Sequence, residues 1–314
     1  MAPKPAKYKS PFVFTGAAFE HEEMLYTLAN KDDCLKFRNF ADSDQGFELR
    51  FDDKNVLVWD KKVEGESMRI VKTFSIFEGT TPAQLWDLLQ ESVYRLTWDT
   101  NCIKCRTVVR MDVRNDICYY ASKAPPGVSD RDVLCQRAWH SVGGGEYVIM
   151  NTSVKHKAVP EKLKYTRAWS LLSGYLIRPH GNGSSSLVFI SQTDPKGLIP
   201  AKIINYVTQK FVPDTVMGLK RAAKGFPEWL AKQEKFERDW DLPEEGWGVP
   251  VPNITLDIVK ERWFSGNATA APAPTVEGEV FSPTTSTVVE ERPPIGDDVD
   301  DDTPAPVEID DDDL

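Results

Sequence analysis

The chain is short of the residues that cross-link or catalyse. Its 314 residues include five cysteines and four histidines. An odd number of scattered cysteines is not a disulfide framework and favours a reduced, cytoplasmic chain; the five are Cys34, Cys102, Cys105, Cys118 and Cys135. Cys102 and Cys105 form a single CxxC pair with no second pair and no histidine close by in the sequence, so we expect no zinc site there.

Catalytic patterns are also missing from the sequence. None of the four histidines lies in a nucleophile–base motif. Neither a phosphate-binding glycine loop nor the spacing of metal ligands occurs. We therefore expect no catalytic residue, no metal and no cofactor, in a protein that is not an enzyme.

Long apolar runs are absent as well. No stretch approaches the roughly 20 apolar residues that a membrane-spanning helix needs. Residues 1–10 are basic and rich in proline, without the apolar centre of a signal peptide. Any contact with a membrane is therefore expected to be peripheral and transient.

Charge is distributed unevenly along the chain. Residues 264–314 hold 14 acidic residues and one basic residue, whereas the rest holds 34 acidic and 37 basic residues. The part before the acidic end is thus nearly neutral, which argues against nucleic acid as a partner. Its slight excess of positive charge is compatible with contact at an anionic membrane surface.

The pattern of apolar residues predicts a mixed α and β structure. A short helix is expected over residues 17–29, a second beginning after the N-cap Thr81, a third over 92–98, and a long amphipathic helix from 199 that Pro213 interrupts near 211–212. Alternating residues predict nine strands over 47–51, 55–61, 67–77, 104–113, 117–122, 132–141, 146–155, 163–177 and 186–193.

This order predicts an α+β fold, a curved and mostly antiparallel sheet of about nine strands covered by the C-terminal helix. A curled sheet that grips one helix leaves an elongated apolar space between them. That space either fills with side chains or holds a ligand, and periodicity alone does not decide between the two.

Charged residues in the strand over 132–141 need partners. Arg131 and Arg137 share one face of the strand and Asp132 points to the other, because successive side chains alternate. Burial of a lone charge is costly. Arg131 and Asp132 are therefore candidates for a structural salt-bridge network, while Arg137 either joins such a network or faces a ligand.

Several motifs together resemble the START domain, a family of lipid-binding modules. The matching segments are Tyr94-Arg95-x-x-Trp98-Asp99, the Arg-Asp-x-x-x-x-Arg run that ends at Arg137, Asp194-Pro195-Lys196-Gly197, and Lys224-Gly-Phe-Pro-Glu-Trp229. The phosphatidylcholine-transfer subgroup is the most similar, including its carrier of phosphatidylcholine and phosphatidylethanolamine. The resemblance implies a helix-grip fold with a hydrophobic tunnel for one lipid and the C-terminal helix as its lid.

The resemblance also implies a site for the lipid head group. Arg95 and Asp99 match the charged pair that meets the phosphate, and a guanidinium suits phosphate oxygens well. Tyr120 stands where the phosphatidylcholine carrier has one aromatic ring of its choline cage. Val133 and Leu171 replace two further cage tyrosines, which puts strict choline selectivity in doubt. Arg137 matches an arginine that faces the cavity in sterol-binding members.

Further residues are candidates for the wall and lid of such a tunnel. The polar candidates on strands are Asn151, Ser153, Ser173 and Gln192, for which a structural role is the alternative. The lid candidates are Ile203, Tyr206, Val207 and Phe211, for which the alternative is plain core packing.

The sequence thus predicts a START domain over residues 14–235, after a disordered N-terminus (1–13) and before an extension (236–264) and an acidic disordered tail (265–314). The expected function is non-vesicular transfer of one phosphatidylcholine or phosphatidylethanolamine by a monomer in the cytoplasm, with phospholipid as cargo. The alternatives are a lipid-responsive adaptor and a domain that binds a sterol or another lipid.

Overall fold

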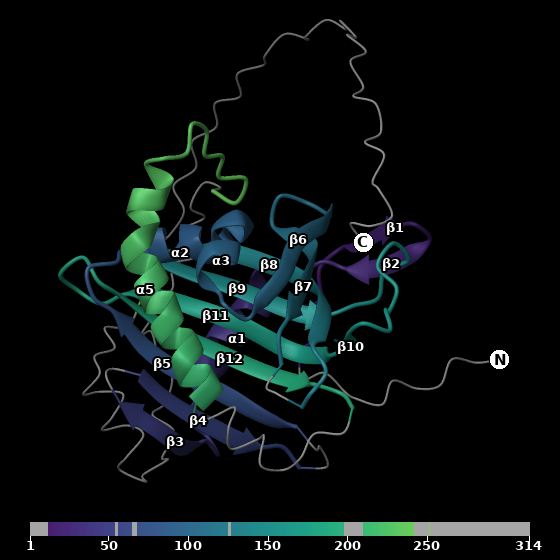
Figure 1. Cartoon of the computed structure of the whole chain (residues 1–314), viewed down its shortest axis with the longest axis horizontal. Coiled ribbons are helices and arrows are strands. Elements are labelled where there is room, and N and C mark those ends of the chain that lie inside the picture. Colours follow the sequence, from purple (N-terminus) through teal and green to yellow (C-terminus); the bar gives the residue numbers. More distant parts are fainter. Residues whose placement is uncertain are drawn as a thin grey trace, which may run out of the picture. The chain divides into compact units, whose positions relative to one another are not determined.

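A ten-stranded sheet organises the computed structural model (Figure 1). The structure describes residues 12–53, 56–64, 68–124, 127–197, 210–241 and 251. All of them belong to the first of two compact units, Met1–Ala268; the second, Thr269–Leu314, holds none of them. None of the described helices is long and apolar enough to span a membrane.

The sheet is antiparallel apart from one short strand. Its order is β3-β4-β5-β12-β11-β9-β8-β7-β6, and β10 pairs in parallel with β8. The bounds are β3 Glu48–Asp53, β4 Val56–Lys62, β5 Arg69–Phe77, β6 Cys102–Arg110, β7 Asn115–Ser122, β8 Arg131–Gly143, β9 Glu146–Ser153, β10 Thr166–Arg167, β11 Trp169–Pro179 and β12 Ser185–Asp194. These strands confirm the predicted α+β class and the mostly antiparallel sheet, with residues 163–177 divided between β10 and β11.

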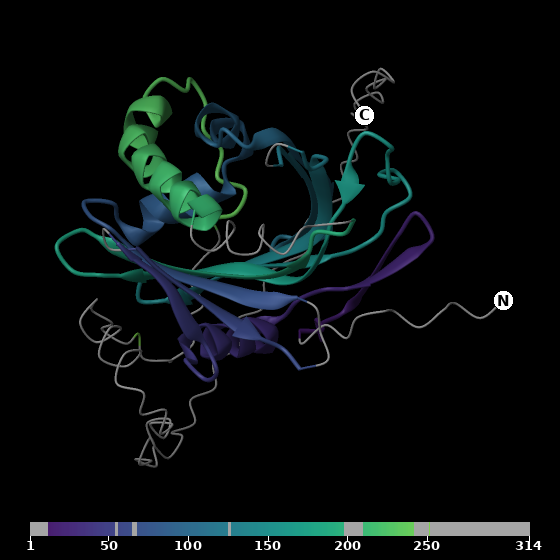
Figure 2. The ribbon, with the colours of Figure 1, turned by 60° about the horizontal axis from the view of Figure 1, so that its bottom comes forward.

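Helices cover both faces of the sheet. The helices α2 (Pro82–Gln90), α3 (Ser92–Trp98) and α5 (Val212–Leu230) lie on one side, and α1 (Lys31–Asp42) lies on the other (Figure 2). The predicted N-cap of α2 is confirmed, because Thr81 and Gln84 cap each other reciprocally. Helix α5 begins at Val212, but Phe211 before it also has helical backbone angles. Residues 199–209 of the predicted helix lie outside the described residues, so the interruption near Pro213 stays a prediction.

Strand alternation sorts the side chains into two layers. On β4, Val56 and Val58 pack with Val216 of α5. The intervening Leu57 packs instead in the core that contains Phe37 of α1. We call these the α5 face and the α1 face of the sheet, and each strand in the middle of the sheet contributes alternate residues to both.

The first predicted element is wrong. Residues 17–29 form a hairpin, β1 (Ala18–His21) and β2 (Met24–Thr27), instead of a helix. Glu22 and Glu23 between the strands have φ angles of 49° and 59°, which close a tight turn that a helix does not allow. The helix lies further on, where Asn30 and Asp33 form the capping box of α1.

A glycine on β11 sets how closely α1 approaches the sheet. A Cβ atom on Gly174 would lie 2.7 Å from the Phe37 ring and against the Ile149 carbonyl oxygen. We expect Gly174→Ala to lower the free energy of unfolding by about 1–3 kcal/mol, because neither backbone nor ring has room to move. Urea denaturation measures it.

Gly218 in α5 is the matched control, because its added Cβ would meet nothing nearer than Arg221, at 3.8 Å. Alanine favours a helix over glycine, so Gly218→Ala should raise stability by up to about 1 kcal/mol. Equal effects of the two substitutions would contradict the packing account.

The chain after α5 turns back onto α2. Asp87 of α2 accepts hydrogen bonds from Arg238 Nε at 2.9 Å and from Trp240 Nε1 at 3.0 Å. Phe236 packs against the ring of Trp229 at the end of α5. The start of the predicted extension is therefore part of the folded structure and anchors the end of α5.

Candidate functional site

A polar cluster lies at the α3 end of the α5 face. Helix α3 ends at Trp98, and Asp99 follows as its C-cap, with its backbone N–H donating to the Arg95 carbonyl oxygen at 3.0 Å. Arg95 and Asp99 therefore lie one turn apart, as their spacing predicts. Strand β7 brings Tyr120 beside them, and its hydroxyl donates to Asp99 Oδ2 at 2.9 Å.

The Arg95 guanidinium lies over two aromatic rings. Its Cζ is 5.6 Å from the ring centre of Trp98 and 5.6 Å from that of Tyr120. Within the described part of the chain, it forms no ion pair with a carboxylate. The Asp99 carboxylate accepts hydrogen bonds from the Tyr120 hydroxyl and from the Asn101 N–H. The guanidinium therefore keeps donors for an anion.

Electrostatics keep both groups in the form that a ligand phosphate needs. Burial acts to lower the pKa of Arg95, but Tyr175, Tyr120 and Asp99 together hold it above its ordinary value, so the guanidinium stays charged. Burial, and then the charge of Asp99, raise the pKa of Tyr120, so its hydroxyl keeps its proton. Trp98 and Tyr175 had no assigned role in the sequence analysis, because contact with Arg95 depends on how α3 lies over the sheet.

Arg137 has a structural partner. Its Nε and Nη2 lie 3.0 Å and 2.5 Å from the two oxygens of Asp116, which is fully buried. The guanidinium also lies over the Trp139 ring, 5.2 Å from its centre. Of the two alternatives left open for Arg137, the structure shows the salt bridge.

The Arg131-Asp132 pair divides between different partners. Asp132 is buried and accepts from Arg167 of β10 at 2.9 Å at both oxygens, and from the Tyr119 hydroxyl at 3.2 Å. Arg131 donates to backbone carbonyl oxygens of residues 195 and 196. The predicted salt bridge at Asp132 is confirmed, but its arginine lies 35 residues along the chain, where no local pattern indicates it.

Three of the four predicted polar wall residues lie on the α5 face. Asn151 pairs with Arg137 and with Ser173 across neighbouring strands, and both Asn151 and Ser173 are partly exposed. Ser153 is buried and its hydroxyl accepts the Ser170 N–H at 2.8 Å. The prediction that Gln192 lines the tunnel is wrong. Gln192 follows Ser191 in β12, so its side chain lies on the opposite, α1 face, where it is 2% exposed.

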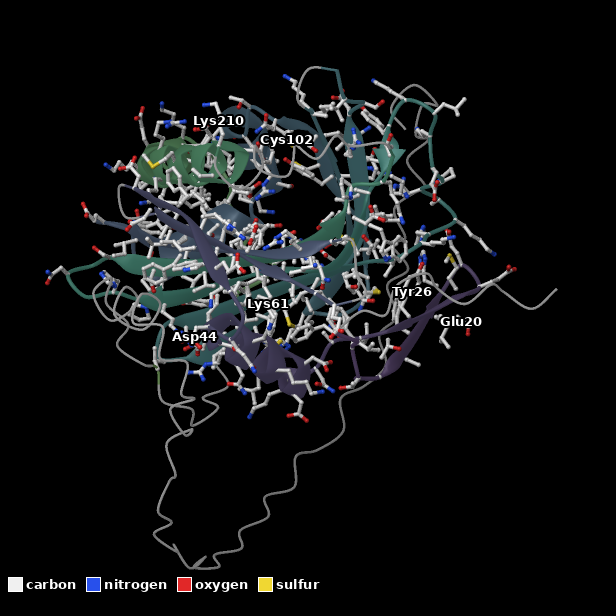
Figure 3. The ribbon with its side chains drawn as sticks, turned by 90° about the horizontal axis from the view of Figure 1, so that it is seen from below. Glu20, Tyr26, Asp44, Lys61, Cys102 and Lys210 are labelled. Atoms are coloured by element: carbon white, nitrogen blue, oxygen red, sulfur yellow. The ribbon has the colours of Figure 1, made fainter. Side chains whose placement is uncertain are left out.

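The α5 face keeps accessible side chains in the middle of the fold. Partly exposed residues on this face are Cys118, Tyr120, Val133, Arg137, Asn151, Ser173, Tyr175, Phe189 and Ser191. Their immediate neighbours on the α1 face, such as Leu134 and Leu176, are buried. Figure 3 shows Cys102 and Lys210 on the α5 side and Asp44 on the other. The sheet is therefore tightly packed on the α1 face, whereas the α5 face keeps a partly exposed area beside the residues that α2 and α5 bury.

The predicted lid is described in part. Ile203, Tyr206 and Val207 lie outside the described residues. Phe211 is the residue immediately before α5, and its ring packs in the apolar cluster of Val56 and Val58. A groove of about 290 Å³ opens at this end of α5, lined by Phe51, Asp53, Val56, Lys210, Pro213, Asp214 and Met217.

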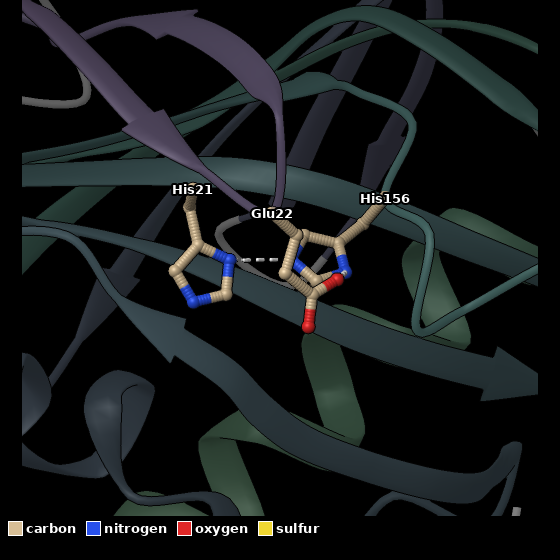
Figure 4. Close-up of side chains that lie close together, drawn as sticks. All are labelled: His21, Glu22 and His156. Carbon is tan, nitrogen blue, oxygen red and sulfur yellow. Dashed lines mark hydrogen bonds and ion pairs between the residues drawn. The ribbon is translucent and has the colours of Figure 1, made fainter.

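A second polar cluster fastens the β1–β2 hairpin (Figure 4). His21 Nδ1 lies 3.1 Å from His156 Nε2, and Glu22 Oε2 lies 3.8 Å from His156 Nδ1. Such a set could ligate a metal. However, the Ala158 N–H donates to His156 Nδ1, so the proton of that ring resides on Nε2 and points at His21. The geometry fits a hydrogen-bonded pair of histidines.

The pair predicts a dependence of stability on pH. Burial lowers the pKa of His156, an effect that Glu22 opposes and His21 reinforces. A histidine with a folded pKa below the unfolded value of about 6.5 costs stability as the pH falls through that value. We expect the free energy of unfolding to decrease as the pH falls from about 7 to about 5.5. The His156→Gln variant should lose the contribution of His156 to this pH dependence. A slope shared by wild type and variant would contradict this assignment, and His180→Gln is the control.

Comparison with known proteins decides the family. A family model described as the START domain matches residues 33–228. The chain belongs to the START domain family. The match starts in α1 and ends near the end of α5, so the β1–β2 hairpin lies outside it.

Relatives and solved structures agree with this START assignment. START domain-containing protein 10 of mouse is 31% identical over 230 residues, 73% of this chain and 78% of the relative. Phosphatidylcholine transfer protein of mouse is 22% identical over 199 residues, 62% of this chain and 92% of the relative. The crystal structure of human STARD10 superposes with a TM-score of 0.65 at 29% identity, covering 71% of this chain and 94% of that one.

Proposed function

We propose that this START domain carries one glycerophospholipid, phosphatidylcholine or phosphatidylethanolamine, between membranes without chemical change and without a cofactor. The observation that carries the proposal is the Arg95 guanidinium, which is charged, faces the accessible side of the sheet and has no carboxylate of the described residues on it. A guanidinium in this state is a binding partner for a phosphate diester.

In this proposal, the residues around Arg95 and the apolar α5 face bind different parts of the lipid. Asp99 and Tyr120 hold each other through the hydrogen bond at 2.9 Å, which leaves the Tyr120 ring under Arg95. The acyl chains would lie along the α5 face, where burial of each CH₂ is worth roughly 0.8 kcal/mol. The acyl chains thus supply most of the affinity, and Arg95, Asp99 and Tyr120 select the lipid by its head group. Arg137 is engaged by Asp116 and is left out of the proposed contacts.

The aromatic rings near Arg95 support the proposed choice of head group. Phosphatidylcholine transfer protein, whose name states its lipid, is similar to this chain. Here the Tyr120 face is shared with Arg95, and Val133 stands opposite Tyr120 on β8. One aromatic face in place of a cage supports tolerance of both choline and ethanolamine.

Release and uptake would take place at a membrane surface. Arg221 and Lys224 are exposed on α5 and suit an anionic bilayer. We propose transient, peripheral contact by a monomeric cytoplasmic protein, with α5 as the element that moves.

Transfer of fluorescent phospholipid between vesicles tests this function. Donor vesicles carry labelled phosphatidylcholine or phosphatidylethanolamine, and acceptor vesicles are unlabelled. The proposal predicts that catalytic amounts of the full chain speed the exchange of both lipids and leave their structures unaltered. Exchange no faster than without protein, or recovery of hydrolysed lipid, would refute it.

A further inference from the structure

The CxxC pair lies in the wall of the head-group site. Cys102 pairs with Ser122 and Cys105 with Tyr120 across β6 and β7. Ser122 and Tyr120 are two residues apart and share the α5 face, so both cysteines face that side as well. A β-bulge between Cys102 and Lys104 makes this possible, because residues three apart in a regular strand point to opposite faces.

The two cysteines bond to both ends of α3. The Cys102 and Cys105 side chains are neighbours on that side of β6, because their partners on β7 are two residues apart. The Cys105 thiol donates to the Ser92 carbonyl oxygen at 3.2 Å, at the start of α3. The Cys102 N–H donates to the Asp99 carbonyl oxygen at 2.9 Å, at its end. The helix that carries Arg95 is thus attached to the dithiol at both ends.

The pair has the features of a reactive dithiol. Both side chains are partly exposed and neither is in a disulfide. The neighbouring Cys102 lowers the pKa of Cys105 and burial opposes this effect; Arg95 lowers the pKa further, whereas Asp99 and Glu91 raise it, and the net direction is downward. A thiolate is the nucleophilic form of cysteine.

The other cysteines on this sheet differ. Cys118 and Cys135 face each other across β7 and β8. Burial raises the pKa of Cys118 to about 11 and also raises that of Cys135. Both therefore stay protonated, whereas Cys105 is partly exposed and pairs with Tyr120, whose ring lies under the Arg95 guanidinium.

We propose that Cys102 and Cys105 form a peroxide-sensitive dithiol, and that its oxidation weakens the binding of phospholipid beside it. The Cys105 thiolate attacks one oxygen of hydrogen peroxide, the O–O bond breaks, and the second oxygen leaves as hydroxide and takes up a proton. The Cys102 sulfur then attacks the resulting sulfenic acid, the S–O bond breaks, and water leaves with the Cys102 proton. Two thiols lose two electrons, and one peroxide becomes two molecules of water.

The effect on the lipid follows from the contacts with α3. The disulfide removes the thiol proton that Cys105 donates to Ser92 and draws Cys102, with its bond to Asp99, toward Cys105. Both changes displace the helix that positions Arg95. This second half of the inference rests on the proposed function, whereas the thiol chemistry does not.

Mass spectrometry of the full chain tests both halves together. The purified protein is treated with hydrogen peroxide and then with dithiothreitol. Intact mass and peptide mapping follow the thiols, and native mass spectrometry follows bound phospholipid. The variants are Cys105→Ser, Cys102→Ser and, as a matched control on the α1 face, Cys34→Ala.

We expect wild type and Cys34→Ala to lose the mass of two hydrogen atoms, to yield a Cys102–Cys105 peptide, and to lose phospholipid several-fold, all reversed by dithiothreitol. Cys102→Ser should stop at a sulfenic acid on Cys105 that dimedone traps, and Cys105→Ser should show neither change. A cross-link that is absent, or that joins Cys118 and Cys135, overturns the proposal.

Two remaining outcomes distinguish the oxidation of the dithiol from its effect on phospholipid binding. A Cys102–Cys105 cross-link with unchanged phospholipid overturns the control of binding. A reduced wild type that carries no phospholipid refutes the proposed function, while the peptide map still decides whether the dithiol exists.

Discussion

Substitution of Arg95 by alanine is expected to weaken the binding of phosphatidylcholine and phosphatidylethanolamine by about 10- to 150-fold. A hydrogen bond to a charged group is worth about 1.5–3 kcal/mol, and each 1.4 kcal/mol is about tenfold in affinity. Titration with a fluorescent phospholipid measures the change. Both head groups should be affected equally, because the guanidinium meets the phosphate that they share.

Arg110→Ala is the matched control for this substitution. Arg110 of β6 also lies over an aromatic ring, 4.9 Å from the centre of Trp139, but it faces Asp239 at the surface at 3.6 Å. Its removal should leave affinity unchanged. Equal losses in the two variants would mean that the overall charge of the domain, and not the position of Arg95, governs binding.

The second large effect is expected at Glu146, far from the proposed site. This carboxylate is fully buried in β9 and accepts from Arg38 of α1 and Arg178 of β11, and Arg178 also pairs with Asp42. We expect Glu146→Ala to reduce the free energy of unfolding by about 3–5 kcal/mol, because two buried guanidinium groups lose their shared partner. Chemical denaturation measures it.

Two further variants make that result specific. Glu146→Gln keeps an acceptor of the same shape and should cost less than alanine, which serves if the alanine variant fails to fold. Glu48→Ala removes an exposed carboxylate from Arg50 and Arg69, which both keep Asp60, and should leave the denaturation midpoint unchanged. A midpoint of Glu146→Gln equal to that of wild type would show that the buried network contributes little.

Local patterns predict the parts of this fold that depend on local chemistry. The capping box at Thr81 and the alternation in β7 and β8 follow from neighbouring residues. Residues 17–29 also suit a helix by apolar spacing, but two consecutive glutamates with positive φ reverse the chain there. Pairing of the hairpin with the rest of the domain, through Tyr26 and His156, outweighs the helical pattern.

Long-range contacts explain what the sequence could not show in the candidate site. Whether Arg137 meets a ligand or Asp116 depends on the register of β7 and β8, which pairs them directly. Gln192 falls on the α1 face because β12 pairs Ser191, and not Gln192, with Ser173. The motif around Arg95 and Asp99 predicts their spacing. It does not predict that the Tyr120 hydroxyl donates to the Asp99 carboxylate, or that the Arg95 guanidinium lies over the rings of Trp98 and Tyr120.

Native mass spectrometry of the full wild-type chain, followed by extraction and identification of what it carries, tests the central claim most directly. The account predicts one phosphatidylcholine or phosphatidylethanolamine per chain, held at the site that contains Arg95. A chain that is empty after incubation with mixed phospholipid vesicles, or that carries a sterol or a free fatty acid instead, would contradict it.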